Sequence, residues 1–317
     1  MTPRPRILSC LPALLSGLLV LASGCTESLD SPTIVRTPRI LAMVAEPPEA
    51  APGQDVRVAA MISVPEDVPR PLRLRWRACL DVATVLDATG LAEVELPGAP
   101  DCDEQTLDVD EPYVVRGERT TALVAELRAL ATLGGFDARV IETVLSTAGL
   151  AYYVDLDVLD AAGAVVVSGY KRAALTTREA PGTNPPAPTF RFGELAISGG
   201  EDPFDFTCAT ENGEIPVVAP LAEVALEPTI AGGLDEEPWL ETFPVFDYTG
   251  GITTARENAY YTWLATAGVI SEFTTRPPER GIVWTAHDEE GPQTLWLVVR
   301  DGHLGARACR LDVMVAR

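Results

Sequence analysis

Histidine, the side chain most often used for proton transfer near neutral pH, occurs only twice in this sequence of 317 residues. His287 and His303 both lie beside predicted turns, and a Ser-His-Asp or Cys-His group would have to include one of them. The sequence contains no G-x-S-x-G, no H-E-x-x-H and no glycine-rich phosphate loop. We therefore expect two exposed loop histidines and no catalytic residues.

Acidic side chains are the one set of metal ligands that the sequence offers. Calcium is bound by carboxylate oxygens, and four carboxylates are grouped at Asp101, Asp103, Asp108 and Asp110. Their spacing lacks the glycine and the distal glutamate of an EF-hand loop, and the other acidic runs are as loosely spaced. We expect no metal and no cofactor, and keep calcium at 101–110 as the alternative.

Paired carboxylates could instead serve glycoside hydrolysis. Asp155 and Asp157 share one face of a predicted strand, but alternation makes this the ordinary solvent face. The aromatic residues on predicted strands are Tyr152, Tyr153, Tyr260, Tyr261, Trp263, Trp284 and Trp296. We expect most of them in the core. An exposed aromatic platform for a sugar or a protein is possible, but no pattern in the sequence indicates one.

The amino terminus has the pattern of an export signal. Arg4 and Arg6 precede an apolar run from Ile7 to Ala22, and small residues follow it. The run is too short and too interrupted to make a bilayer-spanning helix. We expect it to be removed after export.

The residues Leu21-Ala22-Ser23-Gly24-Cys25 resemble the lipobox of bacterial lipoproteins, in which the residue after the cut carries a diacylglyceryl group on its sulfur. The family prefers leucine three residues before the cysteine, where this chain has Ala22. The resemblance implies that Cys25 is lipidated and that the partner is a membrane, reached through the lipid anchor. Since Thr26 is not the aspartate that often retains the family at the inner membrane, it implies an outer membrane lipoprotein, at the periplasmic face or the cell surface.

The composition is that of a folded, acidic protein. Hydrophobic residues make up 47% of the chain, and the formal net charge is -22. Removing residues 1–24, which hold two arginines and no acidic residue, leaves 22 basic against 46 acidic side chains. Such a surface repels phosphate backbones, which excludes nucleic acid as the expected partner.

Four cysteines remain after Cys25 and the signal's Cys10 are set aside. In an exported chain an even number favours disulfides, and four cysteines allow three pairings. The proline-rich stretch from Arg178 to Thr189 reads as a linker and leaves two cysteines on each side. The economical pairing is therefore Cys79–Cys102 and Cys208–Cys309.

The first half of the chain predicts strands separated by Pro/Gly turns, at 39–45, 55–63 and 72–79. Strict alternation in the third strand places Leu72, Leu74, Trp76 and Ala78 inward. The order strand, E-P-P, A-P-G-Q, alternating strand and L-R-W resembles the opening of an immunoglobulin-like domain of bacterial surface lipoproteins, with Trp76 as the buried tryptophan of the third strand.

Residues 119–149 interrupt the strands with leucines at helical spacing. We expect two short helices, divided at Gly134-Gly135 and with Asp137 as the N-cap of the second. Strands then resume at 151–159 and 164–175 around a hairpin turn. The helices are interpreted as an insertion that covers one end of the core.

The second half predicts strands throughout. The succession Y-x-W-L-A-T-A-G, V-W-T-A and G-x-x-T-L-W-L-V-V-R-D-G, within residues 259–315, resembles a PKD-type or related immunoglobulin-like surface module. The fold class is therefore mainly β, with two tandem Ig-like β-sandwich domains held apart by a stiff spacer. The expected organisation is a signal peptide at 1–24, a tether at 25–38, a sandwich with helical insertion at 39–177, a linker at 178–189 and a second sandwich at 190–317.

A non-catalytic role in display, adhesion or partner binding follows by analogy with such modules, with an envelope protein or a glycan as partner. The alternative is a periplasmic or surface enzyme, or a solute-binding component, whose site is not visible in the sequence. A deep pocket with converging polar groups would favour that alternative.

Overall fold

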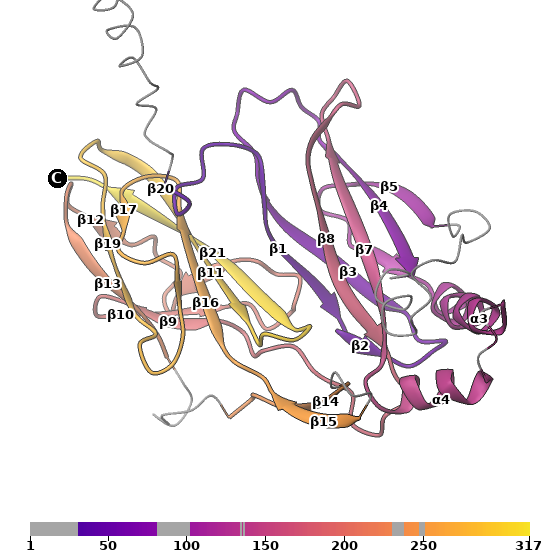
Figure 1. Cartoon of the computed structure of the whole chain (residues 1–317). Helices are drawn as coiled ribbons and strands as arrows, with labels where there is room; N and C mark the ends of the chain where they lie inside the picture. Colours follow the sequence, from indigo (N-terminus) through magenta and orange to yellow (C-terminus); the bar gives the residue numbers. More distant parts are fainter. Residues whose placement is uncertain (1–30, 81–101, 134, 136, 230–237, 247–250) are drawn as a thin grey trace, which may run out of the picture. The chain divides into compact units, whose positions relative to one another are not determined.

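The computed structural model describes residues 31–80, 102–133, 135, 137–229, 238–246 and 251–317 (Figure 1). The expected signal peptide, the lipid site Cys25 and the calcium candidate Asp101 lie outside the described residues. Residues 32–317 form one compact unit. Within the part of the chain that is described, none of the helices combines the length and the apolar character that a membrane span requires.

The first half folds as a β-sandwich of a three-stranded and a five-stranded sheet. The smaller sheet has the order β1 (Arg39–Glu46), β3 (Val56–Ser63) and β6 (Tyr113–Val115). The larger sheet has the order β2 (Glu49–Ala50), β8 (Val165–Leu175), β7 (Leu150–Leu159), β4 (Arg73–Leu80) and β5 (Asp103–Asp108). All neighbours are antiparallel except β2 and β8.

The core of this sandwich follows from alternation along β4. Leu74, Trp76 and Ala78 are buried, as predicted, and Leu72 before the strand is buried as well. The ring of Trp76 stacks on Tyr113 of the opposite sheet at 5.6 Å between centroids. Such a contact between large aromatic rings fixes the two sheets face to face.

Two helices are present between β6 and β7, as the leucine spacing predicts: α3 (Gly117–Leu133) and α4 (Ala138–Ser146). Asp137 is the N-cap of α4, and its side chain accepts a hydrogen bond from Arg139 N at 2.9 Å. Leu127 and Leu145 are buried in the same core as Trp76. The helices therefore belong to the first sandwich and cover one end of it (Figure 1).

The second half is also a sandwich, with sheets of six and five strands. The six-stranded order is β11 (Cys208–Thr210), β10 (Leu195–Gly199), β9 (Thr189–Phe192), β13 (Glu223–Pro228), β19 (Ile282–Thr285) and β17 (Val269–Ile270). The five-stranded order is β12 (Val217–Val218), β21 (Ala306–Val315), β20 (Gly291–Arg300), β16 (Tyr260–Ala265) and β18 (Thr274–Thr275). A hairpin of β14 (Thr242–Phe246) and β15 (Ile252–Arg256) forms a separate sheet.

The two sandwiches repeat one strand order. In each, a short strand (β2 or β12) pairs in parallel with the last strand of the sandwich (β8 or β21). The strand before the last (β7 or β20) lies between that last strand and an earlier one (β4 or β16). The order β2-β8-β7-β4-β5 thus corresponds to β12-β21-β20-β16-β18, and β1-β3-β6 corresponds to β9-β13-β19. This is the order of an immunoglobulin-type sandwich, so the chain is mainly β and Ig-like, with a helical insertion in the first half.

Both disulfides of the economical pairing are present. Cys79–Cys102 joins the end of β4 to the residue before β5 and closes a loop of sequence separation 23. Cys208–Cys309 joins strands of the two different sheets of the second sandwich across a separation of 101. The first bond pins a local loop and the second ties an early strand to the closing one.

The expectation that a stiff spacer holds the halves apart does not hold. Leu41 and Met61 of the first sandwich share a buried cluster with Leu264, Trp296 and Val298 of the second. Residues 178–189 also contact both sandwiches, because Asn184 donates to Ala45 O at 2.7 Å and accepts from Ala306 N at 2.9 Å. The proline-rich segment therefore helps to bind the two sandwiches together.

The predicted tether at 25–38 also ends earlier than expected. Thr33, Ile34 and Val35 are buried. Their backbone pairs with Ala265 at the end of β16, with Val35 N donating to Ala265 O and Ala265 N donating to Thr33 O, each at 2.9 Å. The segment that precedes the first sandwich is therefore attached to the second.

Candidate functional site at the junction of the sandwiches

Of the three calcium candidates that the structure describes, Asp103 and Asp108 are engaged with other side chains, and Asp110 is exposed. Asp108 Oδ1 lies 3.1 Å from Arg73 Nε, and Asp103 accepts a hydrogen bond from Gln105. Among the described residues, no group of three or more His, Cys, Asp or Glu side chains is arranged to hold a metal ion. Asp101 lies outside them, so calcium at 101–110 stays a prediction.

The two histidines differ from each other, contrary to the expectation that both are exposed. His287 lies in a turn with its side chain 38% exposed, and its Nδ1 accepts from Glu289 N at 3.1 Å. The side chain of His303 is only 17% exposed. It lies in the hairpin between β20 and β21, which reaches the first sandwich and thereby buries the ring.

His303 lies between two buried carboxylates. Its Nε2 is 4.0 Å from Glu49 Oε1, and its Nδ1 is 4.0 Å from Glu257 Oε1. The ring of Phe243, from the β14–β15 hairpin, stacks on the imidazole at 3.7 Å between centroids. Glu49 belongs to the first sandwich and Glu257 to the second, so the imidazole is held at the place where the two meet.

Glu49 is fully buried, with its side chain 1% exposed. Its Oε2 forms an ion pair with Arg178 and accepts a hydrogen bond from Gly182 N at 2.6 Å. Its Oε1 has no hydrogen-bond partner among the described residues. A buried carboxylate requires such partners, and here the linker supplies them.

Burial shifts the pKa of several groups in the cluster. Desolvation raises the pKa of Glu257 to about 7 and that of Asp301 to about 6. Desolvation, with repulsion from Arg178 and other cations, lowers the pKa of His303 to about 4, so the imidazole is neutral at pH 7. The junction therefore exchanges protons in the range between pH 4 and pH 7.

The chemistry available to this cluster is proton uptake and charge pairing. No serine, threonine or cysteine side chain of the described residues makes a hydrogen bond to His303. Glu241 adjoins the cluster, because its backbone N donates to Glu257 at 2.9 Å, and among the described residues its carboxylate accepts from one hydroxyl, that of Thr183. A nucleophile next to a base is the mark of covalent catalysis. The contacts observed instead connect linker, hairpin and both sandwiches.

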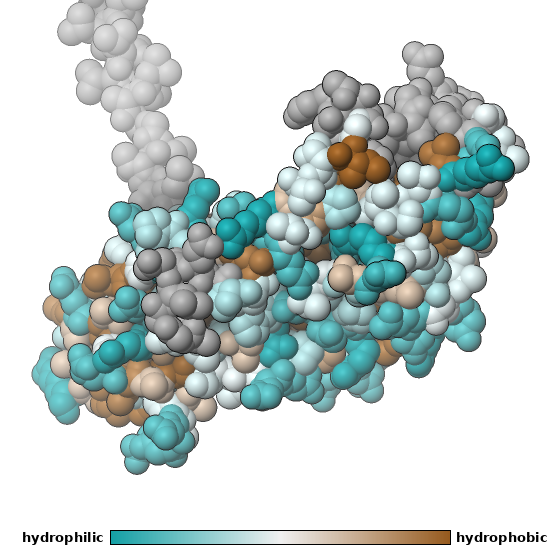
Figure 2. All heavy atoms as spheres, turned by 90° about the horizontal axis from the view of Figure 1, so that it is seen from below, coloured by the Kyte–Doolittle hydropathy of each residue, from teal (hydrophilic) through white to brown (hydrophobic). Residues whose placement is uncertain are grey.

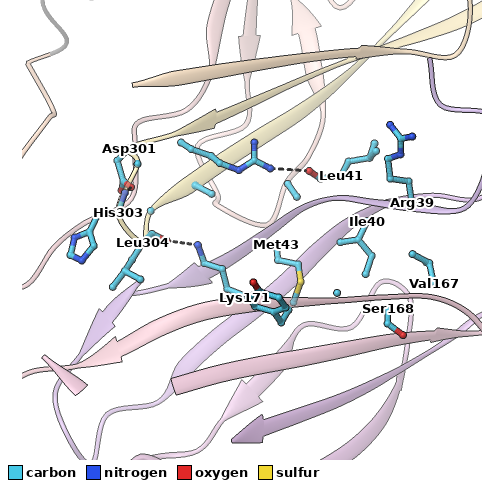
Figure 3. A pocket seen from close by; sticks show the side chains of 17 residues that line it. Arg39, Ile40, Leu41, Met43, Val167, Ser168, Lys171, Asp301, His303 and Leu304 are labelled. Atoms are coloured by element: carbon cyan, nitrogen blue, oxygen red, sulfur yellow. Dashed lines mark hydrogen bonds between the residues drawn. The ribbon is translucent and has the colours of Figure 1, made fainter. Parts of the chain in front are cut away.

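A cleft of about 380 Å³ lies beside this cluster, between β1, β8 and the β20–β21 hairpin. Lys171 reaches across it and donates to Leu304 O, while Arg300 donates to Leu41 O at 3.3 Å (Figure 3). Ile40 and Met43 of β1 contribute apolar side chains. This cleft was not predicted, because its walls come from segments more than 120 residues apart.

The outer face of the five-stranded sheet in the first sandwich is polar. Asp157 was expected on the solvent side but is 7% exposed, because Arg75, Arg77 and Ser168 all bond its carboxylate. Most strand aromatics are buried, as predicted. Tyr153 and Tyr260 are half-buried, and Tyr170 of β8, which was not among the expected core aromatics, is 67% exposed.

No family model matches the sequence, and no curated protein matches it. Among solved structures, the D00-D0 domain of intimin covers 89% of this chain and is itself covered to 99%, with 9% identity and a TM-score of 0.21. The chicken CNTN1 FN1-FN3 domains match over 89% of this chain and 66% of their own length, with 6% identity and a TM-score of 0.22. The fibronectin(III)-like modules of Clostridium thermocellum CbhA match over 88% of this chain and 94% of their own length, with 11% identity and a TM-score of 0.21. The fold assignment rests on the strand order and the two cores described above.

Proposed function

We propose that this chain is a non-catalytic, lipid-anchored protein of the bacterial outer membrane that binds a partner outside the cytoplasm. The observation that carries the proposal is the pair of disulfides, one in each sandwich. Disulfides of this kind persist in oxidising compartments, which agrees with an export signal at 1–24 that directly precedes Cys25. Lipidation of Cys25 would place the body on the periplasmic face or at the cell surface.

The packing of the two sandwiches supports a role in display or adhesion. In the second sandwich the outer face of the five-stranded sheet carries Trp296 and Val298, and the first sandwich covers it. The corresponding face of the first sandwich, with Arg75 and Tyr170, is polar and uncovered by the second. The outer face of the five-stranded sheet is thus buried between the sandwiches in the second half of the chain, whereas the same face in the first half remains accessible to a partner.

An acidic, solvated exterior is compatible with this role. Teal and white residues occupy most of the face seen in Figure 2, and brown residues occur in separate groups. With 46 acidic against 24 basic side chains, the chain is suited to an envelope protein or a glycan as partner and not to nucleic acid. We propose no cofactor.

A second candidate function is an enzyme or a solute-binding component. The observation in its favour is His303 between Glu49 and Glu257, close to a cleft. Replacing His303 by Gln would abolish turnover or solute binding in that case. A binding protein that uses its sheet edges or faces would keep its partner affinity in this variant.

The location is tested on the full-length chain expressed in a Gram-negative bacterium. We expect the protein in the outer membrane fraction, and intact mass spectrometry should find residue 25 as an acylated amino terminus. Cys25→Ser should release the protein into the soluble periplasmic fraction, with Cys10→Ser as the matched control that keeps it membrane-bound. An unacylated product, or a cytosolic one, would contradict the proposal.

A further inference from the structure

The last strands of the two sandwiches differ in how their outer edges are covered. The parallel pairs Glu49–Ala174 and Val217–Met314 occupy the same place in the repeated strand order. Aligning them puts Tyr170 of β8 at the position of Arg310 of β21. The two strands can therefore be compared residue by residue.

The edge of β21 is bonded at three points spread along the strand. Arg310 N donates to Phe206 O at 2.7 Å, Met314 N to Pro216 O at 2.9 Å, and Ala306 N to the side chain of Asn184 at 2.9 Å. Thr207 and Val217 both run parallel to the strand that they meet. In the second sandwich, extended segments thus fill this edge.

The corresponding edge of β8 is bonded only at its end. Ala174 N donates to Pro48 O at 3.1 Å and Thr176 N to Ala50 O at 2.8 Å. Because pairing groups alternate along an antiparallel strand, the N–H groups of Ser168, Tyr170 and Arg172 also point away from β7. No described residue accepts a hydrogen bond from these three, and the cleft of about 380 Å³ adjoins residues 167–171.

We propose that the edge of β8 from Ser168 to Arg172 is a docking site for an extended segment of a partner protein, added in parallel as a further strand of the five-stranded sheet. The cleft volume falls in the range of ligand pockets. Residues 165–170 are rich in valine and contain no proline, and Val165 and Tyr170 are exposed, so the charged residues that protect this edge against pairing are confined to Lys171 and Arg172 at its end. Backbone groups give the affinity in this mode of recognition.

The charge of the cleft indicates the side chains of that segment. Arg39, Lys171 and Arg300 line it against one carboxylate, Asp301, in a chain whose acidic residues outnumber the basic ones. Ile40 and Met43 form its apolar wall (Figure 3). A segment that alternates β-branched apolar and acidic residues complements both features.

A second copy of this chain fits the edge less well. Two β8 strands related by a twofold axis pair antiparallel, whereas the segments that cover these edges within the chain all run parallel. Such pairing also brings the Arg172 side chains of both copies to one edge, where their positive charges repel each other. The complementary partner is a different, acidic polypeptide.

The test uses the purified chain without its signal and an acetylated, amidated peptide of seven residues that alternates valine and glutamate. We expect saturable binding, with slowed hydrogen exchange at the amides of Ser168, Tyr170 and Arg172. Tyr170→Pro removes one edge N–H and should weaken binding at least tenfold, whereas the matched control Tyr170→Thr keeps the N–H and should bind. Proline is tolerated on an edge strand, so the variant is expected to fold.

The probe can also be varied instead of the protein, which keeps the test valid if Tyr170→Pro does not fold. A peptide N-methylated at alternate residues should not bind. Among charge variants of the protein, Arg39→Glu should weaken binding, whereas Arg139→Glu on α4, the matched charge change, should not. Absence of binding, equal binding by the methylated peptide, or preference for a lysine peptide would overturn the proposal. A dimer in light scattering that Tyr170→Pro dissociates would overturn it in favour of a second copy. This inference deepens the proposed partner binding, and its failure leaves the acylation and fractionation results unaffected.

Discussion

Arg300 donates a hydrogen bond from Nη2 to the carbonyl oxygen of Leu41 at 3.3 Å, across 259 residues of sequence. The bond joins β20 of the second sandwich to the outer edge of β1 in the first. It lies next to the buried cluster that contains Leu41 and Trp296. The two Ig-like sandwiches are therefore expected to unfold as one cooperative unit.

The first prediction concerns the apolar part of the junction. Trp296→Ala should lower the free energy of unfolding by about 3–5 kcal/mol, since it deletes a large buried side chain and leaves a cavity. We expect urea denaturation to change from one transition to two, as the sandwiches lose their coupling. Val269→Ala, at a side chain 65% exposed in the same sandwich, is the control and should change stability little. A single transition of unchanged midpoint in Trp296→Ala would contradict this account.

The second prediction concerns the ion pair between Glu49 and Arg178. Arg178→Met should cost about 3–5 kcal/mol, because it leaves a buried carboxylate without its cation. Adding Glu49→Gln should recover much of this loss, since the uncompensated charge is removed. A double-mutant cycle measured by urea denaturation provides the coupling free energy. Purely additive effects of the two changes would show that the pair is not coupled.

The third prediction concerns pH. Burial raises the pKa of Glu257 to about 7, above the 4.5 of the unfolded chain, so the folded state binds the extra proton between these values. Its contribution to stability is present at pH 4.5 and is lost as the pH rises to 7, with an expected size of about 1–3 kcal/mol. Asp301 acts in the same direction, and His303, whose pKa is lowered, acts in the opposite one.

Glu257→Gln isolates this contribution. The difference in unfolding free energy between the variant and the parent chain should increase in favour of the variant from pH 5 to pH 8. Glu223→Gln, which removes a carboxylate from an exposed position, serves as the control for the loss of one surface charge. A flat difference for Glu257→Gln would mean that this carboxyl titrates as it does in water.

The fourth prediction compares the disulfides. Replacing both Cys208 and Cys309 by Ser should cost about 4–5 kcal/mol, and the same change at Cys79 and Cys102 about 3 kcal/mol, because the closed loops differ in length. Changing both partners avoids a free thiol. Urea denaturation of the two double variants measures the order, and the reverse order would contradict the loop-entropy account.

The sequence was informative where a signal is local. Alternation along β4 predicted the buried Leu74 and Trp76, and the N-cap Asp137 predicted where α4 begins. These features depend on period and capping within a few residues. The predictions for β4 and α4 are confirmed because neither depends on residues that are distant in the sequence.

The junction was missed although two strands carry a signal for it. The runs Ile40–Ala45 in β1 and Leu295–Val299 in β20 are apolar without interruption, and both are buried along nearly their whole length. Continuous apolar runs are typical of strands covered on both faces. An alternating strand would have been expected for sandwiches held apart. The partner of each run, however, is more than 200 residues away and cannot be identified from one sequence.

The candidate site was less predictable than the fold. His303 follows Asp301-Gly302, a pattern typical of an exposed hairpin turn. The turn is present, but the hairpin docks against Glu49 and Phe243, which come from distant segments. Only the arrangement of the two sandwiches buries the imidazole.

The pairing of Thr33 and Val35 with Ala265 has a mechanical consequence. A force applied at the amino end, where an anchor would hold the chain, reaches the carboxy-terminal sandwich before it loads β1. The short parallel attachment at β16 would then act as a shear clamp, so that tension is shared by both sandwiches instead of peeling the first one strand by strand.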